Sequence, residues 1–314
     1  MFDDYQSIEI APGRDMIGGL AKIEASAMNP ADIPIVDTHQ HLWDLSRFRL
    51  PWPKPGSPLA HSFLMANYLR AIEGLNVVKA IYMEVDLIPE QQQAEAEYVI
   101  DLCERGTTPT VAGVISGRPE CDGFKDHISR FKGSRWIKGV RQVLHNADLP
   151  AGLCLRDPFV RSIRLLGDLG MSFDLCLRHG ELLDGARLID LCPGTRFILD
   201  HCGNPNVRAA DRTQWERDIA EVARRKNVVV KISGILASVN PEHWTVEEIA
   251  PLINHTINVF GPDRVMFGGD WPVCTLAGTF KEWLEAVQSV VADRGEAERR
   301  KLFHDNAMTF YGLV

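Results

Sequence analysis

The sequence predicts a single α/β domain of the (β/α)8 type, a TIM barrel. Eight short apolar runs rich in β-branched residues occur at 33–38, 77–85, 110–115, 136–141, 171–177, 196–200, 227–232 and 264–267. Amphipathic stretches with helical spacing lie between them, for example at 90–104, 158–169, 213–225 and 246–260. Such alternation predicts parallel strands joined by helices. The near-continuous apolar character of the runs indicates burial on both faces, and eight units predict a closed barrel.

We assign residues 33–314 to the barrel and residues 1–32 to an N-terminal extension, because the first 32 positions show no clear periodicity. A chain of 314 residues is ordinary for one barrel of this type. A doubly wound open sheet is the alternative fold. It is disfavoured because the sequence contains no G-x-G and therefore no dinucleotide fingerprint.

The amino-acid composition limits the kinds of molecule that the protein can be expected to bind. The net charge of -8 argues against nucleic acid, which requires clustered Lys and Arg. We find no basic, apolar leader at the N-terminus and no apolar run near the roughly 18 residues of a membrane helix. The seven cysteines are odd in number and form no C-x-x-C pair, which fits a reducing compartment. We therefore expect a cytoplasmic protein that acts on a small molecule, and the oligomeric state is open.

The end of the first strand carries the strongest chemical signal. In barrels of this type, catalytic residues come from the carboxyl ends of the strands and the loops that follow. The first run leads into Asp-Thr-His-Gln-His at 37–41. Alternate residues of an extended chain share a face, so His39 and His41 can both bind one metal ion. The alternative is two polar residues that cap the strand.

Two further strand ends add a histidine and a carboxylate. The sixth run leads into Asp-His-Cys-Gly-Asn-Pro, which places His201 at the rim as a zinc ligand or a partner for a carbonyl. The eighth run leads into Gly-Gly-Asp-Trp-Pro, where Asp270 can bind the metal, accept a proton from water, or do both in turn. Structural alternatives are a hydrogen-bonded turn histidine and an N-cap aspartate.

Other strands supply weaker candidates. Arg141, at the end of the fourth strand, could hold a substrate carboxylate or an oxyanion, or form a structural salt bridge. Lys138 differs from it in parity, so a straight strand cannot aim both inward, and we favour Arg141 and a mononuclear site. Glu84 interrupts the apolar second run and is expected either to bind substrate or to form a buried salt bridge. His179 and His145 are candidates for substrate binding or structure.

The connection at 42–63 is long and contains four prolines together with Trp43 and Trp52. Its length and rigidity suit a loop that covers the mouth of a site, and we take Trp43 as a substrate-binding candidate. The alternative is a surface excursion that packs on its own aromatic residues.

Four motifs give the chain a family resemblance. These are Asp-Thr-His-Gln-His-Leu-Trp-Asp at 37–44, Phe-Ile-Leu-Asp-His-Cys-Gly-Asn-Pro at 197–205, Lys-Ile-Ser-Gly at 231–234 and Met-Phe-Gly-Gly-Asp-Trp-Pro-Val-Cys at 266–274. They resemble the amidohydrolase superfamily, in particular its "amidohydrolase 2" branch of TIM-barrel hydrolases related to sugar-acid lactonases. The resemblance implies a lactone substrate and one divalent ion, or none. It also implies that His39, His41 and Asp270 lie on the metal side, with Asp270 as the base.

The resulting hypothesis is a metal-assisted hydrolase, with zinc as the expected ion, that opens a small sugar-acid or related carboxylated lactone. Asp270 accepts the proton of the attacking water, and His201 with Arg141 stabilises the oxyanion. The main alternative is a metal-dependent decarboxylase of the same branch, and a third is a barrel that binds a small molecule without turnover. A serine hydrolase is disfavoured because no G-x-S-x-G elbow occurs.

Overall fold

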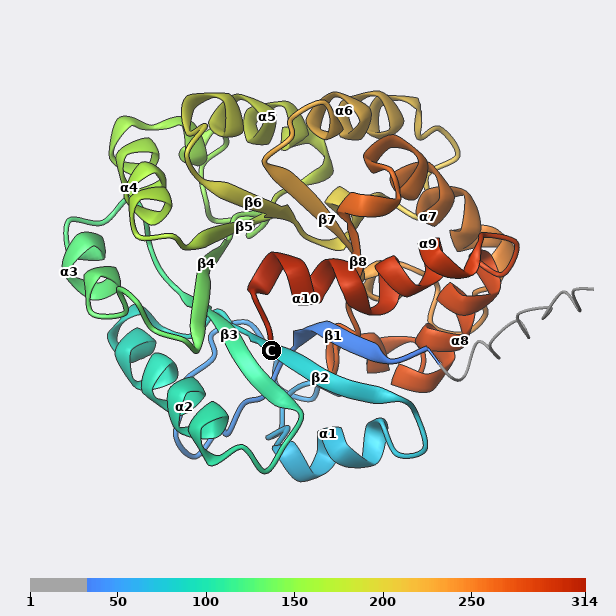
Figure 1. The fold of residues 1–314 in the computed structure, drawn as a ribbon, viewed down its shortest axis with the longest axis horizontal. Helices are drawn as coiled ribbons and strands as arrows, with labels where there is room; N and C mark the ends of the chain where they lie inside the picture. The colour runs from blue at the N-terminus through green and yellow to red at the C-terminus, as the bar shows by residue number, and fades with distance from the viewer. Residues whose placement is uncertain (1–32) are drawn as a thin grey trace, which may run out of the picture.

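The computed structural model describes residues 33–314. The N-terminal extension predicted for residues 1–32 therefore lies outside the described residues. The remainder forms one eight-stranded sheet in the order β1 to β8, with every neighbouring pair parallel. Helices surround this sheet (Figure 1), and the predicted barrel is confirmed. The strands are β1 Ile35–Gln40, β2 Val77–Met83, β3 Thr110–Ser116, β4 Ile137–Val143, β5 Ser172–Cys176, β6 Arg196–Leu199, β7 Val228–Ile232 and β8 Val265–Phe267.

The helices that cover the barrel agree with the predicted amphipathic stretches, and the structure adds several that the sequence analysis did not specify. A π-helical turn, Lys301–Asp305, joins the last two helices of the chain, α9 and α10. The helices are α1 Met65–Ala71, α2 Gln92–Arg105, α3 Phe124–Ser129, α4 Asp157–Asp168, α5 Leu182–Leu191, α6 Thr213–Ala223, α7 Val246–Phe260, α8 Phe280–Val290, α9 Glu296–Arg300 and α10 Asn306–Tyr311.

Side-chain hydrogen bonds help to close the barrel between β8 and β1, beside a backbone bond from the N–H of His41 to the carbonyl of Trp271 at 2.8 Å. The hydroxyl of Thr38 donates to the carbonyl of Phe267 at 2.6 Å. The carboxylate of Asp37 accepts a hydrogen bond from the backbone N–H of Gly269 at 2.7 Å. Both bonds join β1 to the end of β8, so the loop that carries Asp270 is anchored beside His39.

The interior of the barrel is apolar toward the amino ends of its strands. Here α10 crosses the barrel (Figure 1), and its Ala307 and Tyr311 pack against strand side chains. Because these strand residues are fully buried and apolar, they supply hydrophobic stabilisation without polar side chains that need partners. Its strand members are Val36, Ile81, Met83, Ala112, Val114, Ile198 and Met266.

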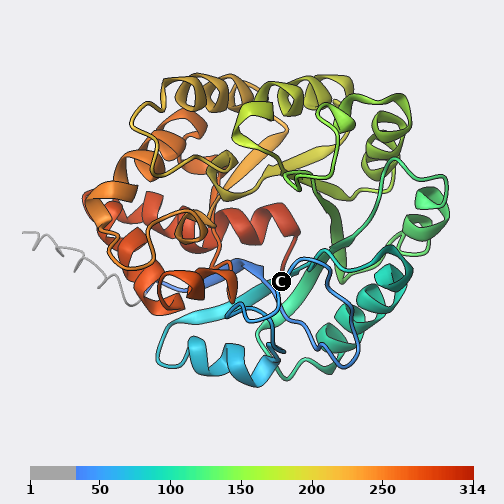
Figure 2. The same ribbon diagram turned by 180° about the vertical axis from the view of Figure 1, so that it is seen from behind.

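The long connection after β1 combines the two arrangements considered for it. Trp43 is buried, and its indole N–H donates to the carbonyl of His61 at 2.6 Å. Its ring contacts both Trp52 and Phe63. Trp52, by contrast, donates to the carbonyl of Val85 at 2.8 Å and lines the cavity described below. The loop therefore packs on its own aromatics and presents one tryptophan to the site. Figure 2 shows it at the end of the barrel opposite α10.

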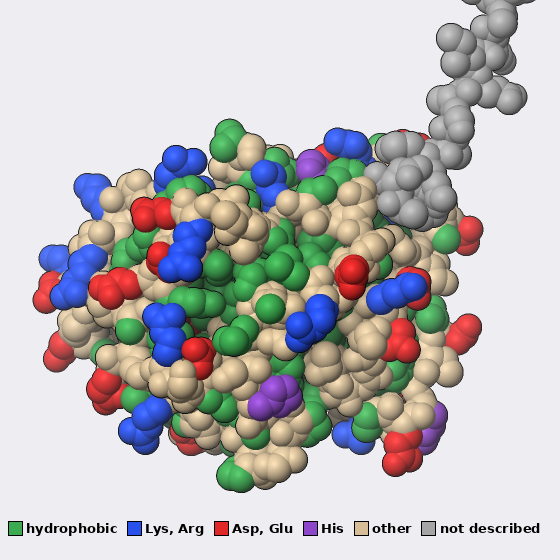
Figure 3. All heavy atoms as spheres, turned by 90° about the horizontal axis from the view of Figure 1, so that it is seen from below, with side chains coloured by type: hydrophobic (Ala, Val, Ile, Leu, Met, Phe, Trp, Pro, Cys, Tyr) green, Lys and Arg blue, Asp and Glu red, His purple; other side chains and the backbone are tan. Residues whose placement is uncertain are grey.

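The outer surface carries charges of both signs. On the flank shown in Figure 3, basic and acidic side chains alternate around the margin and hydrophobic side chains gather toward the middle. No helix within residues 33–314 has the length and apolar character needed to cross a membrane.

Candidate active site

A cavity of about 520 Å³ opens at the carboxyl ends of the strands. This volume is in the range of small-molecule sites, and the location is the one at which barrels of this type place their chemistry. The cavity is formed by loops that follow different strands. Its lining includes His41, Arg141, His145, His179, His201 and Asp270.

The two histidines of the first strand approach the same carboxylate. Nε2 of His41 lies 3.4 Å from Oδ1 of Asp270, and Nε2 of His39 lies 3.7 Å from that oxygen. Nδ1 of His41 lies 3.0 Å from the carbonyl oxygen of Met83, a contact that requires a proton on Nδ1. The lone pair on Nε2 of a neutral His41 then faces Asp270. Two electron-rich atoms at this separation call for a cation or a proton between them.

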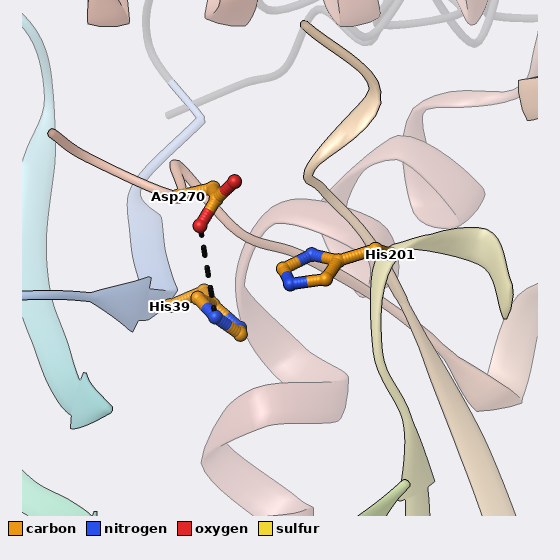
Figure 4. A group of neighbouring side chains, drawn as sticks. All are labelled: His39, His201 and Asp270. Atoms are coloured by element: carbon orange, nitrogen blue, oxygen red, sulfur yellow. Dashed lines mark ion pairs between the residues drawn. The ribbon is translucent and has the colours of Figure 1, made fainter. Parts of the chain in front are cut away.

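His201 enters the same group from the end of β6. Ligand atoms of His39, His201 and Asp270 all lie within 4.8 Å of one another. Figure 4 shows the three side chains directed toward one another. Nδ1 of His201 lies 2.9 Å from the hydroxyl of Ser233, which can donate or accept. Burial lowers the pKa of His201 against the opposing effect of Asp270, so the ring is neutral near pH 7.

Glycine is required beside His201. A Cβ added to Gly234 would lie 2.3 Å from Nδ1 of His201, and Gly234 also has a φ of +70°. His201 and Asp270 themselves have φ of 54° and 52°, in the left-handed region. The Ser-Gly pair after β7 thus makes room for the imidazole and supplies its hydrogen-bonding partner, which explains the motif at 231–234 in physical terms.

Arg141 combines the two roles considered for it. Its Nε donates to Oε1 of Glu84 at 2.7 Å, and Nη2 donates to the backbone carbonyl of Glu84 at 2.8 Å. Nη1 lies 3.1 Å from Nε2 of His39 and 3.4 Å from Oδ2 of Asp200. These contacts engage four of the roughly five N–H groups of a guanidinium, and the side chain still lines the cavity. Arg141 is a buried ion-pair partner that can offer one donor to a ligand.

A layer of buried charges lies beneath the histidines. Lys231 is fully buried; its Nζ lies 2.6 Å from Asp174 and 3.2 Å from Asp200. The same Nζ lies 3.4 Å from Nδ1 of His39. Burial and the neighbouring Lys231 hold the pKa of His39 well below its ordinary value, so its ring is neutral. A charged residue within an apolar run was the sequence signal for this layer, as it was for Glu84.

The other predicted residues divide between the cavity and its surroundings. His179 and His145 line the cavity. Glu84 is fully buried on Arg141 and does not line it. Trp43, which was predicted to bind substrate, is buried and does not line the cavity. The loop turns Trp43 toward Phe63, and Trp52 lines the cavity in its place.

Lys138 lies at the other end of the barrel. It lines a separate hollow together with Arg196 and the end of α10, away from the histidines. The parity argument that favoured Arg141 over Lys138 therefore agrees with their positions. Asp86, Asn146, Arg178 and Asn204 also line the cavity and were not predicted as site residues. Each follows closely after a strand end, and Asn204 also lies within the motif at 197–205; the sequence carries no other signal for them.

The fold and this site define a TIM-barrel protein with a histidine–carboxylate centre at the carboxyl end of the barrel. Comparison with known proteins gives the family: the amidohydrolase family model matches residues 36–313, so the chain belongs to the amidohydrolases.

Two curated relatives match almost the whole chain. An L-fucono-1,5-lactonase of Burkholderia multivorans is 25% identical over 291 residues, covering 88% of this chain and 96% of that protein. An L-rhamnono-gamma-lactonase of Scheffersomyces stipitis is 26% identical over 334 residues, covering 89% of this chain and 98% of that protein. A crystal structure of a Burkholderia multivorans amidohydrolase with bound zinc superposes with a TM-score of 0.79 at 24% identity. It covers 90% of this chain and 100% of that one, and this likeness supports the fold.

Proposed function

We propose that this protein is a metal-assisted hydrolase that opens a small lactone. The observation that carries the proposal is the convergence of three histidines and one carboxylate, His39, His41, His201 and Asp270, at a cavity of small-molecule size. Two full-length relatives named as lactonases support the choice of a cyclic ester as the substrate. The seven cysteines, none of them in a disulfide, fit the further proposal of a cytoplasmic location.

The donor set fits one divalent ion, and we propose zinc. His39, His41 and Asp270 would hold it, because Met83 fixes the tautomer of His41 and leaves Nε2 as the ligand atom facing Asp270. Such an ion polarises a carbonyl and lowers the pKa of water toward about 7. Two imidazoles and a carboxylate are ligand types that zinc prefers.

The protein's own residues carry the proton and stabilise the charge. Asp270 accepts a proton from the attacking water as the water oxygen bonds to the lactone carbonyl carbon. With the hydroxyl of Ser233 donating to Nδ1, the neutral His201 keeps a proton on Nε2 for the developing oxyanion. The uncommitted N–H of Arg141 is the second donor. Asp270 then returns its proton to the ring oxygen as the carbon–oxygen bond breaks, giving a hydroxy acid.

The experiment is a panel of sugar-acid lactones, assayed for acid release with a pH indicator, using protein of measured metal content. The control is Asp270→Asn, which keeps the shape of the side chain and removes the base. We expect one or more lactones to be opened by the wild type and not by the variant. Full activity of Asp270→Asn at unchanged metal content would contradict the mechanism. Release of CO2 from a carboxylate substrate, with no lactone opened, would assign the protein to the decarboxylases instead.

A further inference from the structure

Besides Asp270, the cavity lining contains a second carboxylate, that of Asp86. Asp86 follows β2 and lines the cavity with a φ of 48°. Its Oδ1 accepts a hydrogen bond from Arg118 at 2.9 Å, and its Oδ2 accepts one from the amide of Asn146 at 2.8 Å. Arg118 follows β3 and Asn146 follows β4, so three neighbouring loops hold this carboxylate in place. Each oxygen retains a lone pair that can accept a further bond.

The cationic side chains of the cavity are already neutralised. Arg178 donates from Nη1 to both oxygens of Glu181, at 3.0 and 2.9 Å. Its Nη2 donates to the backbone carbonyls of Asn146 and Leu149. The guanidinium is therefore held by protein acceptors and does not present an open fork for bidentate recognition of a carboxylate.

Arg141 is neutralised in the same way, by Glu84 and Asp200. His145 adds no positive charge, because burial and the neighbouring His201 lower its pKa to about 4. Within residues 33–314, the arginines that line the cavity thus have anionic partners. Asp86 is likewise paired with Arg118, but each of its oxygens keeps a lone pair free to accept from a ligand. An anionic substrate would therefore find no open guanidinium fork in this lining, whereas a hydroxyl group would find a free acceptor at Asp86.

Two parts of the cavity lining differ in what they can bind. The reactive part comes from β1, β6 and β8, which carry His41, His201 and Asp270. The part formed by the loops after β2 and β4 offers Asp86 and Asn146, whose oxygens can accept hydrogen bonds from hydroxyl groups. Both groups line the same cavity of about 520 Å³, so a lactone with its carbonyl at His201 shares the cavity with these acceptors.

We propose that Asp86 and Asn146 form a hydroxyl-binding subsite that selects uncharged, polyhydroxylated lactones over lactones carrying a carboxylate or a sulfonate. The subsite rests on the proposed lactonase function and specifies its substrate class. It narrows the sequence-based hypothesis, which admitted carboxylated lactones. Asp86 contributes as an acceptor that a substrate hydroxyl satisfies and that a substrate carboxylate or sulfonate, which has no proton to donate, leaves unsatisfied.

The first arm of the test compares substrates on the wild-type protein. L-fucono-1,5-lactone is the hydroxylated neutral probe, δ-valerolactone is the ring without hydroxyls, and 2-pyrone-4,6-dicarboxylate is the anionic probe. We expect kcat/KM to be at least about a hundredfold higher for the first than for the third, since a charged hydrogen bond gained and an unpaired substrate anion avoided each contribute roughly tenfold or more.

The second arm uses Asp86→Asn, because asparagine tolerates the left-handed backbone at this position. We expect KM for the hydroxylated lactone to rise about tenfold with little change in kcat, and KM for δ-valerolactone to stay unchanged. The matched control is Asp122→Asn, an exposed carboxylate on the loop after β3 that lies outside the cavity, which should leave both constants unaltered.

The outcomes separate the subsite from the function. An equal rise in KM for both neutral lactones, or a preference for the dicarboxylate, would overturn the subsite while leaving a lactonase. Absence of Asp270-dependent turnover with every lactone would instead overturn the proposed function. A change confined to the hydroxylated substrate would support both.

Discussion

The two ends of the barrel differ in the polarity of the residues that line them and in the conformation of the backbone. At the carboxyl ends of the strands the cavity is lined by histidines, carboxylates and arginines. All five non-glycine residues with positive φ within residues 33–314 lie on the loops at this end. They are Asp86, His201, Cys202, Asn204 and Asp270. At the amino ends, by contrast, the interior is a fully buried apolar layer that α10 covers.

This difference separates function from stability. Left-handed backbone at a non-glycine residue costs about 1–3 kcal/mol, and buried polar groups must each find a partner. The apolar layer offsets such costs through burial of side chains such as Ile198 and Met266. Between the two lies the layer of paired charges around Lys231, which holds His39 from below. Substitutions in the three layers should therefore give different signatures.

The largest effect is expected at the carboxyl end. Asp270→Asn should reduce kcat/KM for the preferred lactone at least about a thousandfold, equivalent to about 4 kcal/mol of transition-state stabilisation, because the proton acceptor and one proposed metal ligand are lost. Since asparagine fits the same backbone, the melting temperature should change by only a few degrees. Steady-state kinetics and thermal unfolding of the same preparation measure both, and a large drop in melting temperature would place Asp270 in the stability category instead.

The next effect is expected in the charged layer. Lys231→Met leaves Asp174 without its buried cation and Asp200 with Arg141 alone, so the free energy of unfolding should fall by about 3–5 kcal/mol. The matched control is Lys301→Met, which removes an exposed pair with Asp263 and should cost less than about 1 kcal/mol. Denaturant unfolding compares the two, and equal losses would show that burial of Lys231 is not what makes its pairs important.

A third prediction compares the two ends of the barrel by substituting residues in and just after a single strand, β6. Ile198→Ala in the apolar layer should lower the free energy of unfolding by about 2–5 kcal/mol through a cavity, with kcat/KM within about twofold of wild type. His201→Asn, just past the end of the same strand, should show the reverse pattern. If Ile198→Ala instead reduced activity strongly at a temperature where the protein is folded, the two ends would be coupled rather than separate.

The smallest effect concerns pH. Burial, and to a smaller extent the nearby negative charge of Glu84, raises the pKa of Glu95 from 4.5 to about 7. A raised carboxyl pKa stabilises the fold fully below about 4.5 and loses that contribution as pH rises through about 7. Wild-type stability should thus fall by up to about 3 kcal/mol more than that of Glu95→Gln between pH 5 and 8. Parallel stability curves for the two proteins across this range would contradict the assignment.

Much of the fold could be predicted from the sequence because its signals are local. All eight strands appear near the predicted runs, and β1 continues to Gln40, so His39 lies within the strand rather than after it. The role of α10 could not be predicted, because a short helix gains its place from packing against the strands and not from its own pattern.

The residues of the candidate site also divide into those with a local sequence signal and those without one. Residues at strand ends, such as His201 and Asp270, could be predicted because a barrel brings those ends together. Which tryptophan of the long loop reaches the cavity could not, since this depends on the loop backbone that turns Trp52 inward and Trp43 away. The partners of Glu84 and Lys231 likewise depend on side chains that meet across the barrel.

The most direct test of the account is to open the preferred lactone in water labelled with heavy oxygen and to locate the label by mass spectrometry and NMR. Attack by water activated at Asp270 on the ring carbonyl predicts one labelled oxygen in the product carboxylate, and none in the new hydroxyl group. Label in the hydroxyl, or release of CO2 in place of ring opening, would contradict hydrolysis at this site.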